Sequence, residues 1–192
     1  RPPLANGDAD RMRGSYLGPV FEQGRIEGEL KAAGARFDVL DDGDVITATA
    51  DALADGKSVG WMQGRMEFGP RALGGRSILG DPRSPTMQKL LNLKVKYRES
   101  FRPFAPSVLE DKVSTCLHGS HEVPFMIIVY RVRADWRERL NAITHQDGTG
   151  RVQTLRRDTK APHHDLIRQV ERRTPLPVLL HTPFTAHEPI HP

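Results

Sequence analysis

Glycine and arginine are concentrated in one segment of the sequence, between residues 61 and 77. The segment contains four glycines and three arginines: Gly64, Gly69, Gly74, Gly75, Arg65, Arg71 and Arg76. Glycine lets the backbone approach a ligand closely, and a guanidinium group binds phosphate or carboxylate through paired hydrogen bonds. Together they predict an anion site for a phosphate or a nucleotide. The alternative is a surface turn whose arginines are solvated.

A second basic cluster lies between residues 94 and 104 and interleaves cationic with aromatic side chains. Its members are Lys94, Lys96, Tyr97, Arg98, Phe101, Arg102 and Phe104. Neither cluster matches the Walker A loop or the dinucleotide-binding fingerprint, so neither predicts those folds. Two dense clusters at short separation favour the anion site over the surface turn.

The elements that must position these clusters indicate a mixed α/β domain. Apolar spacing predicts helices over residues 21–33, 45–54, 84–93 and 163–173. Extended segments are predicted over residues 37–40, 58–62, 104–109, 124–132, 142–145, 151–155 and 177–180. We expect Asp42 or Asp44 to cap the second helix, and Leu90 to face inward on the third. The frequent prolines favour antiparallel pairs in the sheet.

Two of the expected strands bear on the site. The run 124–132 is the strongest strand signal and is expected to be buried on both faces. The strand 177–180 leads into a loop that begins at His181, and loops at strand ends in α/β sheets often hold ligands. A tight turn over residues 147–150 is expected to connect the extended segments 142–145 and 151–155, the second of which begins with Arg151.

The composition suits one globular domain that binds anionic small molecules. The chain has 192 residues, a net charge of +4 and 38% hydrophobic residues. A nucleic-acid binder usually carries a continuous basic stripe, whereas acidic residues are mixed in here, so nucleic acid is not the favoured partner. The single cysteine, Cys116, excludes an internal disulfide and fits a cytoplasmic protein. No apolar run is long enough for a membrane helix, so no membrane partner is expected.

Longer motifs in the chain resemble the NodU/CmcH family of O-carbamoyltransferases. They are residues 64–74 (GRMEFGPRALG), 76–79 (RSIL), 81–83 (DPR), 101–106 (FRPFAP) and 144–149 (THQDGT). The match runs from about residue 14 to 190 and corresponds to the family's C-terminal domain. Residues 1–14 would then be a linker or arm from a missing N-terminal domain, and residues 15–192 a YrdC-like domain truncated at its end. That fold is an α/β arrangement in which a twisted mixed sheet, flanked by helices, surrounds a basic concave site.

The resemblance implies a two-domain enzyme that uses ATP with Mg²⁺ and carbamoyl phosphate as co-substrate. The C-terminal domain would form carbamoyladenylate and pyrophosphate. An N-terminal actin-like domain of the same polypeptide, which holds iron or another metal, would then carbamoylate a hydroxyl of a small molecule. Acceptors in the family include antibiotic intermediates and lipo-chitooligosaccharide signals. This chain could perform at most the activation half.

The same resemblance assigns the site residues. Lys96 would place a compact charge on a phosphate, and Arg71 and Arg151 would act as forks on phosphate or a carbamoyl oxygen, so these three form the catalytic set. The ligand-binding set is Arg71, Arg76, Lys96, Arg102, His145, Arg151, His181 and Thr182, with no metal ligand. The other basic residues of the clusters, Arg65, Lys94 and Arg98, are expected to face solvent.

The chain departs from the family pattern near its end, and this keeps an alternative open. Pro183 stands where the family has a serine expected to contact phosphate, and proline has neither a hydroxyl nor an N–H group. The glycine expected before Glu188 is absent, and Gly75 replaces a usual asparagine. One alternative is therefore a degenerate, non-catalytic domain that only docks on the acceptor-binding half. A separate alternative is an RNA-binding module of the same fold, because the resemblance implies a basic concave face that suits nucleic acid in some YrdC-type domains.

Overall fold

The computed structural model of the protein describes residues 12–84 and 86–184. Most of the expected N-terminal arm lies outside these residues, and so do residues 185–190, where part of the departure from the family pattern falls. The described chain begins with a short 3-10 helix, Arg13–Ser15. The fold is mixed α/β, as the sequence predicts.

The centre of the molecule is a five-stranded mixed sheet with the strand order β1-β2-β8-β3-β7. Its strands are β1 (Val59–Met62), β2 (Arg76–Gly80), β3 (Ala105–Leu109), β7 (Gln153–Leu155) and β8 (Val178–Thr182). Strands β3 and β7 pair in parallel, and the other three pairs are antiparallel. The expected preference for antiparallel pairs is thus confirmed for most of this sheet.

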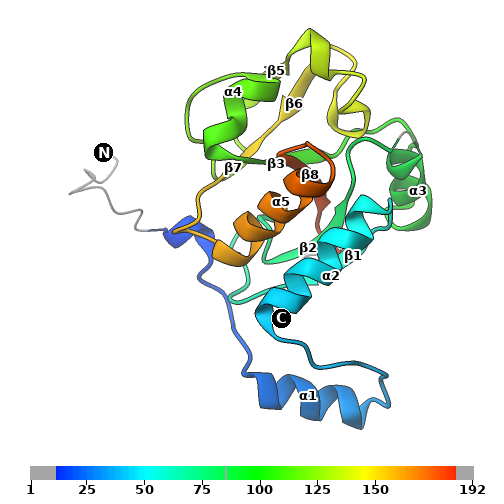
Figure 1. Cartoon of the computed structure of the whole chain (residues 1–192), viewed down its shortest axis with the longest axis vertical. Helices are drawn as coiled ribbons and strands as arrows, with labels where there is room; N and C mark the ends of the chain where they lie inside the picture. Colours follow the sequence, from blue (N-terminus) through cyan, green and yellow to red (C-terminus); the bar gives the residue numbers. More distant parts are fainter. Residues whose placement is uncertain (1–11, 85, 185–192) are drawn as a thin grey trace, which may run out of the picture.

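Strand β8 lies in the middle and is buried along its whole length, because hydrophobic clusters cover both faces of the sheet. Its side chains alternate between the two clusters: Val178 and Leu180 join one, and Leu179 joins the other. Helices α2 (Asp42–Ala54) and α5 (Ala161–Arg173) lie side by side and cover the Leu179 face (Figure 1).

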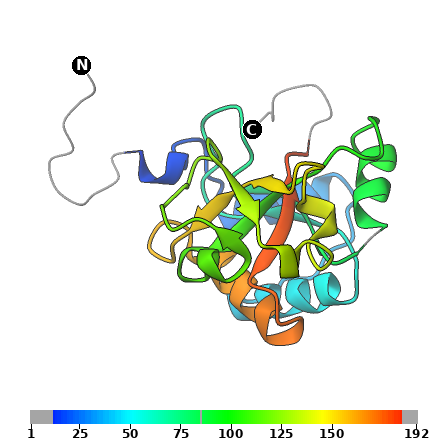
Figure 2. The ribbon, with the colours of Figure 1, turned by 90° about the horizontal axis from the view of Figure 1, so that it is seen from above.

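A smaller sheet covers the opposite face of the central sheet (Figure 2). It is formed by β4 (Leu117–His118), β5 (Val129–Val132) and β6 (Thr149–Arg151), in that order. Around it lie α3 (Met87–Lys94), α4 (Val113–Cys116) and the 3-10 helices Glu110–Lys112, Ala134–Trp136 and Asn141–Ile143. Cys116 is a buried free thiol in the core cluster of this layer.

Helix α1 (Gln23–Ala32) stands apart from the two layers (Figure 1). It buries none of its side chains, and an ion pair between Arg25 and Glu29 supports its exposed face at 2.8 Å. The helix expected over residues 21–33 is therefore present, but it does not contribute to the hydrophobic core.

Three sequence expectations about strands are wrong. Residues 37–40 form no strand, because Val39 and Leu40 are exposed and simply lead to the N-cap of α2. The run 124–132 is a strand only from Val129 onward, and Ile127 is 79% exposed rather than buried. Ile128 and Val129 are exposed as well, while Met126 and Val132 are buried, so no continuous buried strand forms and the first part of the run is a turn.

The strand expected over residues 142–145 is a 3-10 helix, Asn141–Ile143, which buries the same apolar side chains in one turn. Helix α2 starts three residues before the expected position, because Asp41 rather than Asp42 or Asp44 is its N-cap and accepts from the Asp44 amide at 2.8 Å. Leu90 on α3 faces solvent, at 41% exposure, and not the core.

Candidate functional site

A cavity of about 410 Å³ opens where the C-terminal end of β8 meets the N-terminal end of β3 and the end of β6. The sequence indicates a loop that begins at His181 as the position for ligand binding, but His181 and Thr182 are the last two residues of β8 and the chain leaves the strand only at Pro183. The cavity is lined by Pro70, Arg71, Ala72, Lys96, Arg98, Arg102, Pro103, Phe104, Ala105, Met126, Val129, His145, Arg151, His181, Thr182 and Pro183. This volume falls within the range of about 300–1,000 Å³ that is usual for small-molecule pockets.

The loop between β1 and β2 brings Arg71 to the cavity, and a buried carboxylate holds this loop in shape. Glu67 is 3% exposed, and its Oε1 atom accepts hydrogen bonds from the amides of Leu73, Gly75 and Arg76 at 2.7, 2.8 and 3.2 Å. Charge-assisted hydrogen bonds of this kind are among the strongest in proteins. The glutamate therefore fixes the path of the backbone on the C-terminal side of Arg71.

Further polar groups support this loop from below. Tyr16 donates its hydroxyl hydrogen to the carbonyl of Leu73, which also accepts from Gln153 Nε2 at 2.9 Å. Lys160 Nζ donates to the carbonyl of Gln63 at 2.6 Å, near the start of the loop. The loop is thus attached to α5, β7 and the N-terminal segment, and its shape depends on residues far away in the sequence.

Gly74 is one position in the loop where glycine is required. Its φ angle is +94°, and a Cβ atom there would lie 1.7 Å from Nδ1 of the buried His163. Any other residue would combine a strained backbone with a collision against α5. The close packing of loop and helix therefore explains this glycine of the cluster.

Arg76 does not reach the cavity, although the sequence placed it in the ligand-binding set. It is 6% exposed and donates to the carbonyls of Gly75 and Gly64 at 2.8 and 3.0 Å. Burial lowers its pKa, and the nearby Glu67 carboxylate acts in the opposite direction. Arg76 is therefore a structural residue of the loop.

Lys96 lies two residues beyond α3 and lines the cavity as a buried cation, 3% exposed. Its Nζ donates to the carbonyl of Pro183, so the residue that replaces the expected serine still contacts the site through its backbone. Burial, together with the charge of Arg98, lowers the pKa of Lys96 to about 8. Lys96 is therefore protonated at neutral pH but titrates within an accessible range.

Arg98 also lines the cavity, which contradicts the expectation that it faces solvent. Its Nε donates to Asn92 Oδ1 at 2.6 Å, and its guanidinium lies over the ring of Phe104 at 4.8 Å. Arg65 and Lys94 are exposed as expected, and Arg65 donates to the carbonyl of Leu17. The second basic cluster thus contributes three cations to the cavity instead of two: Lys96, Arg98 and Arg102.

Arg151 ends β6 and is half-buried in the cavity wall. The expected turn positions it, because Asp147 Oδ1 accepts from the amide of Thr149 at 2.9 Å and Gly148 has a φ angle of +78°. Burial lowers the pKa of Arg151, and the charges of Arg71 and Arg102 lower it further. Residues 71, 102 and 151 are far apart in the sequence but close enough in space to repel one another.

Two histidines and Thr182 complete the polar lining. His145 Nδ1 lies 3.2 Å from Thr149 Oγ1, so one of its ring nitrogens is engaged within the turn. His181 is 2% exposed, and burial together with the charge of Arg151 lowers its pKa to about 3. At neutral pH it is an uncharged imidazole in a cationic cavity.

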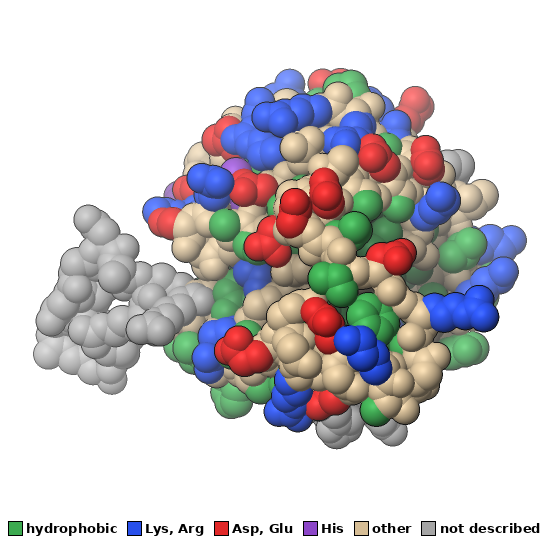
Figure 3. Space-filling model, turned by 60° about the horizontal axis from the view of Figure 1, so that its bottom comes forward, with side chains coloured by type: hydrophobic (Ala, Val, Ile, Leu, Met, Phe, Trp, Pro, Cys, Tyr) green, Lys and Arg blue, Asp and Glu red, His purple; other side chains and the backbone are tan. Residues whose placement is uncertain are grey.

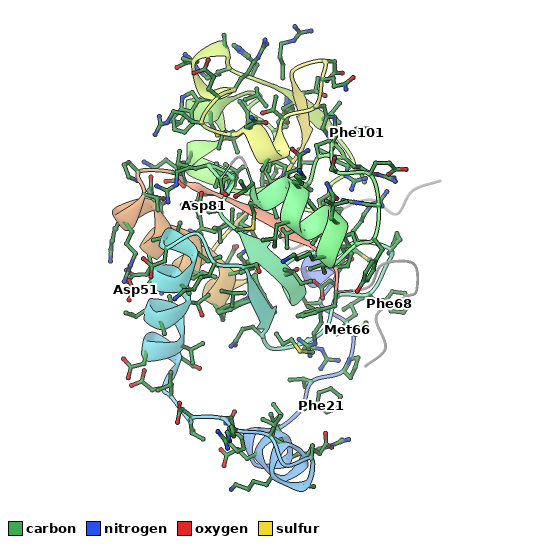
Figure 4. All side chains as sticks on the ribbon, turned by 90° about the vertical axis from the view of Figure 1, so that its right-hand side faces the viewer. Phe21, Asp51, Met66, Phe68, Asp81 and Phe101 are labelled. Carbon is green, nitrogen blue, oxygen red and sulfur yellow. The ribbon has the colours of Figure 1, made fainter. Side chains whose placement is uncertain are left out.

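Sequence reasoning missed the apolar part of the lining, where Met126 and Val129 face the cavity. Both belong to the run that was expected to be a core strand. Two exposed aromatic side chains, Phe68 and Phe101, are 70% and 69% exposed and lie on the side of the molecule opposite to Asp51 on α2 (Figure 4). Arg71, three residues after Phe68, and Arg102, directly after Phe101, line the cavity.

Taken together, the lining is cationic and lacks compensating acids. Five of its side chains are Lys or Arg, and among the described residues it includes no Asp or Glu. On the face of the molecule in Figure 3, by contrast, Lys and Arg side chains are mixed with Asp and Glu. The described residues contain no group of three or more His, Cys, Asp or Glu that could hold a metal ion. The fold and site define an α/β domain suited to binding a polyanion.

Comparison with known proteins assigns this domain to a family. The family model "Carbamoyltransferase C-terminus" matches residues 50–191, so the chain belongs to that family. This confirms the resemblance to the NodU-type carbamoyltransferases.

Three relatives illustrate the match. An uncharacterised protein of Synechocystis sp. is 48% identical over 94% of this chain and 33% of its own length. The nodulation protein NolO of Bradyrhizobium diazoefficiens is 45% identical over 94% of this chain and 34% of its own length. Nodulation protein U of Rhizobium tropici is 36% identical over 90% of this chain and 28% of its own length. The chain thus spans about a third of the length of these relatives.

No helix in the part of the chain that the structure describes is long and apolar enough to cross a membrane.

Proposed function

We propose that this domain catalyses the activation half of an O-carbamoyltransferase reaction. It would bind carbamoyl phosphate and ATP together and form carbamoyladenylate with release of pyrophosphate. The observation that carries this proposal is the convergence of five cationic side chains on one cavity whose described lining holds no carboxylate. Membership of the carbamoyltransferase family supports the same chemistry.

The atom balance of this reaction sets the roles of the site. Carbamoyladenylate keeps the carbamate of carbamoyl phosphate but not its phosphate, so one water must enter and inorganic phosphate must leave. A carbamate oxygen then attacks the α-phosphorus of ATP, and the bond from that phosphorus to the pyrophosphate oxygen breaks. Negative charge gathers on the phosphoryl oxygens in this step, and fixed cations that face it lower the barrier.

Individual residues fit these charges in different ways. Lys96 is the buried point charge and would contact a phosphate deep in the cavity. Arg71 and Arg102 are exposed at the cavity and would hold the outer phosphates as forks. Arg151 is half-buried and close enough to both for their charges to lower its pKa, and it would contact the α-phosphate and the carbamate oxygen. Arg98, held by Asn92 and Phe104, adds a fifth positive charge.

A Mg²⁺ ion on ATP would supply further positive charge to the phosphates when bound. The described lining does not fit an ion held by the protein itself, because it lacks the carboxylates that Mg²⁺ prefers. We therefore assign no step to the ion, and expect it to enter and leave with the nucleotide phosphates.

The transfer half of the reaction belongs to the remaining two thirds of a protein of the relatives' length. An N-terminal actin-like domain with its own metal would pass the carbamoyl group to a hydroxyl of a small molecule. Two of the relatives are nodulation proteins by name, which makes a small signalling molecule one class of acceptor. A cytoplasmic location would suit both ATP and carbamoyl phosphate as substrates.

Phosphorus NMR tests the proposal directly. The folded chain is incubated with Mg²⁺, ATP and carbamoyl phosphate, and inorganic phosphate, pyrophosphate and a new adenylate resonance are followed. We expect pyrophosphate to appear only when both substrates are present, and not with Lys96→Met. An exposed lysine at the end of α3 gives the matched control, Lys94→Met, which should remain active.

Two other outcomes would favour the alternatives. A folded chain that binds neither substrate by calorimetry, but binds the rest of the longer protein, would be a docking domain. Retention of RNA with a preference for its shape at moderate salt would indicate an RNA-binding module. Either result would overturn the activation proposal.

A further inference from the structure

The cavity offers many hydrogen-bond donors and few acceptors. Its five cationic side chains can only donate, because ammonium and guanidinium groups carry no acceptor atom. Phosphate oxygens suit this lining. A carbamoyl group differs from a phosphate because its amino group is a hydrogen-bond donor and needs an acceptor in the cavity.

His181 is a buried lining residue whose hydrogen-bonding capacity is unused. It lies near the end of β8, paired with Leu79 on β2 and with Ala105 on β3, and is 2% exposed. Neither Nδ1 nor Nε2 has a hydrogen-bond partner among the described residues. An unsatisfied buried polar group costs free energy, which a bound ligand would recover.

The charge state of this ring suits an acceptor role. Burial and the neighbouring Arg151 lower the pKa of His181 to about 3, so the imidazole is neutral at physiological pH. A neutral imidazole has one N–H donor and one bare nitrogen that accepts.

The other polar lining groups are partly engaged. His145 Nδ1 faces Thr149 Oγ1 at 3.2 Å, and the carbonyl of Pro183 accepts from Lys96. His163 is buried near His181, with 6.2 Å between ring centroids, but it is not a lining residue. Thr182 also offers a hydroxyl acceptor in the lining. Among the described lining side chains, His181 is the one whose two ring nitrogens are both buried and without a hydrogen-bond partner.

We propose that His181 accepts a hydrogen bond from the amino group of the carbamoyl moiety and so selects carbamoyl phosphate over acyl phosphates. This inference rests on the proposed function and adds a specificity residue to it. Acetyl phosphate is the informative competitor, because a methyl group replaces the amino group and the phosphate is the same. A site built to pair a substrate N–H discriminates strongly against an analogue without it.

Calorimetric binding of carbamoyl phosphate and acetyl phosphate to the full chain tests this selection. We expect the wild type to prefer carbamoyl phosphate by about tenfold, the effect of one hydrogen bond. His181→Leu should abolish that preference by weakening carbamoyl phosphate alone. His181→Asn should retain it, because the amide oxygen also accepts, and His163→Leu controls for the loss of a buried ring outside the lining.

Three results would overturn the inference, and each differs from a failure of the proposed function. If His181→Leu weakens the binding of carbamoyl phosphate and acetyl phosphate equally, the ring contacts the phosphate group or stabilises the fold. A loss confined to ATP would show that His181 pairs with adenine instead. A wild type that binds both ligands equally has no selection. A folded wild type that binds neither carbamoyl phosphate nor ATP would refute the proposed function together with this inference.

Discussion

Replacement of Arg151 by methionine should affect stability and ligand binding in opposite directions. In the free protein, burial and the charges of Arg71 and Arg102 disfavour the charged guanidinium, and its buried Nε has no partner among the described residues. Arg151→Met keeps most of the apolar stem but removes the charge. The free variant should therefore be more stable by about 1 kcal/mol, the scale of one unsatisfied buried donor. For a domain of this size that corresponds to a rise in Tm of about 2–4 °C.

Binding should show the reverse effect. A hydrogen bond to a charged group contributes about 1.5–3 kcal/mol, so loss of Arg151 should raise the Kd for pyrophosphate by about 10- to 150-fold. A ligand at 100 times its Kd stabilises the folded state by about 2.7 kcal/mol. At the same pyrophosphate concentration the variant, whose Kd is at least about tenfold higher, would be stabilised by at most about 1.4 kcal/mol. The ligand therefore stabilises the wild type more than the variant by an amount larger than the extra stability of the free variant. The variant should melt at the higher temperature without pyrophosphate, and the wild type should melt at the higher temperature with it.

Thermal melts with and without pyrophosphate measure both effects in one assay. Arg131→Met on the neighbouring strand β5 provides the control, because Arg131 is exposed and lies outside the cavity lining. That variant should melt like the wild type under both conditions. The reasoning is refuted if Arg151→Met lowers the Tm of the free protein and pyrophosphate then raises the Tm of wild type and variant equally. Arg151 would then be a structural residue.

Three further predictions concern other parts of the site. Because the pKa of Lys96 is about 8 without ligand, anion binding above that pH requires proton uptake. Calorimetry should show a constant affinity for pyrophosphate below about pH 8 and a fall in affinity of up to about tenfold per pH unit above it. Lys96→Met should remove this dependence on pH. A variant with the same pH profile as the wild type would contradict the role of Lys96. Arg98→Met should weaken pyrophosphate by about 10-fold or more, whereas a solvent-facing residue would leave the Kd unchanged. Glu67→Ala leaves buried loop amides unpaired and should lower the free energy of unfolding, measured in urea, by about 3 kcal/mol. Replacement of the exposed Glu138 by alanine should lower it by less than about 0.5 kcal/mol. Equal effects of the two substitutions would contradict the role of Glu67.

The sequence predicted the type of fold and most of the cationic lining. The helical spacing of apolar residues was sufficient to predict α5, because residues 166, 167 and 170 all pack in one core cluster. The strand signal of the run 124–132 was misleading, because an apolar run does not show which of its residues a second layer covers: Met126 and Val132 are buried, and Ile127 is exposed. Ile127 shows this most clearly, since it is the most exposed large hydrophobic residue in the run.

The candidate site shows the same limit at the level of single residues. Arg71, Lys96 and Arg151 were grouped through the family resemblance, and the structure brings all three to one cavity. Two arginines are placed opposite to the expectation: Arg76 is bonded to backbone carbonyls away from the cavity, whereas Arg98 lines it and is held by Asn92 and Phe104, each six residues away. The order of residues in a motif does not reveal such partners, because they depend on the path of the loop.

The most direct test of the central claim is a crystal structure of the chain with carbamoyl phosphate and an ATP analogue that cannot release pyrophosphate. We predict both ligands in the cavity after β8, with phosphate oxygens within hydrogen-bond distance of Arg71, Lys96 and Arg151. Ligand density elsewhere on the surface, with these three side chains placed as in the free protein, would contradict the claim that they form one site for two phosphate-bearing substrates.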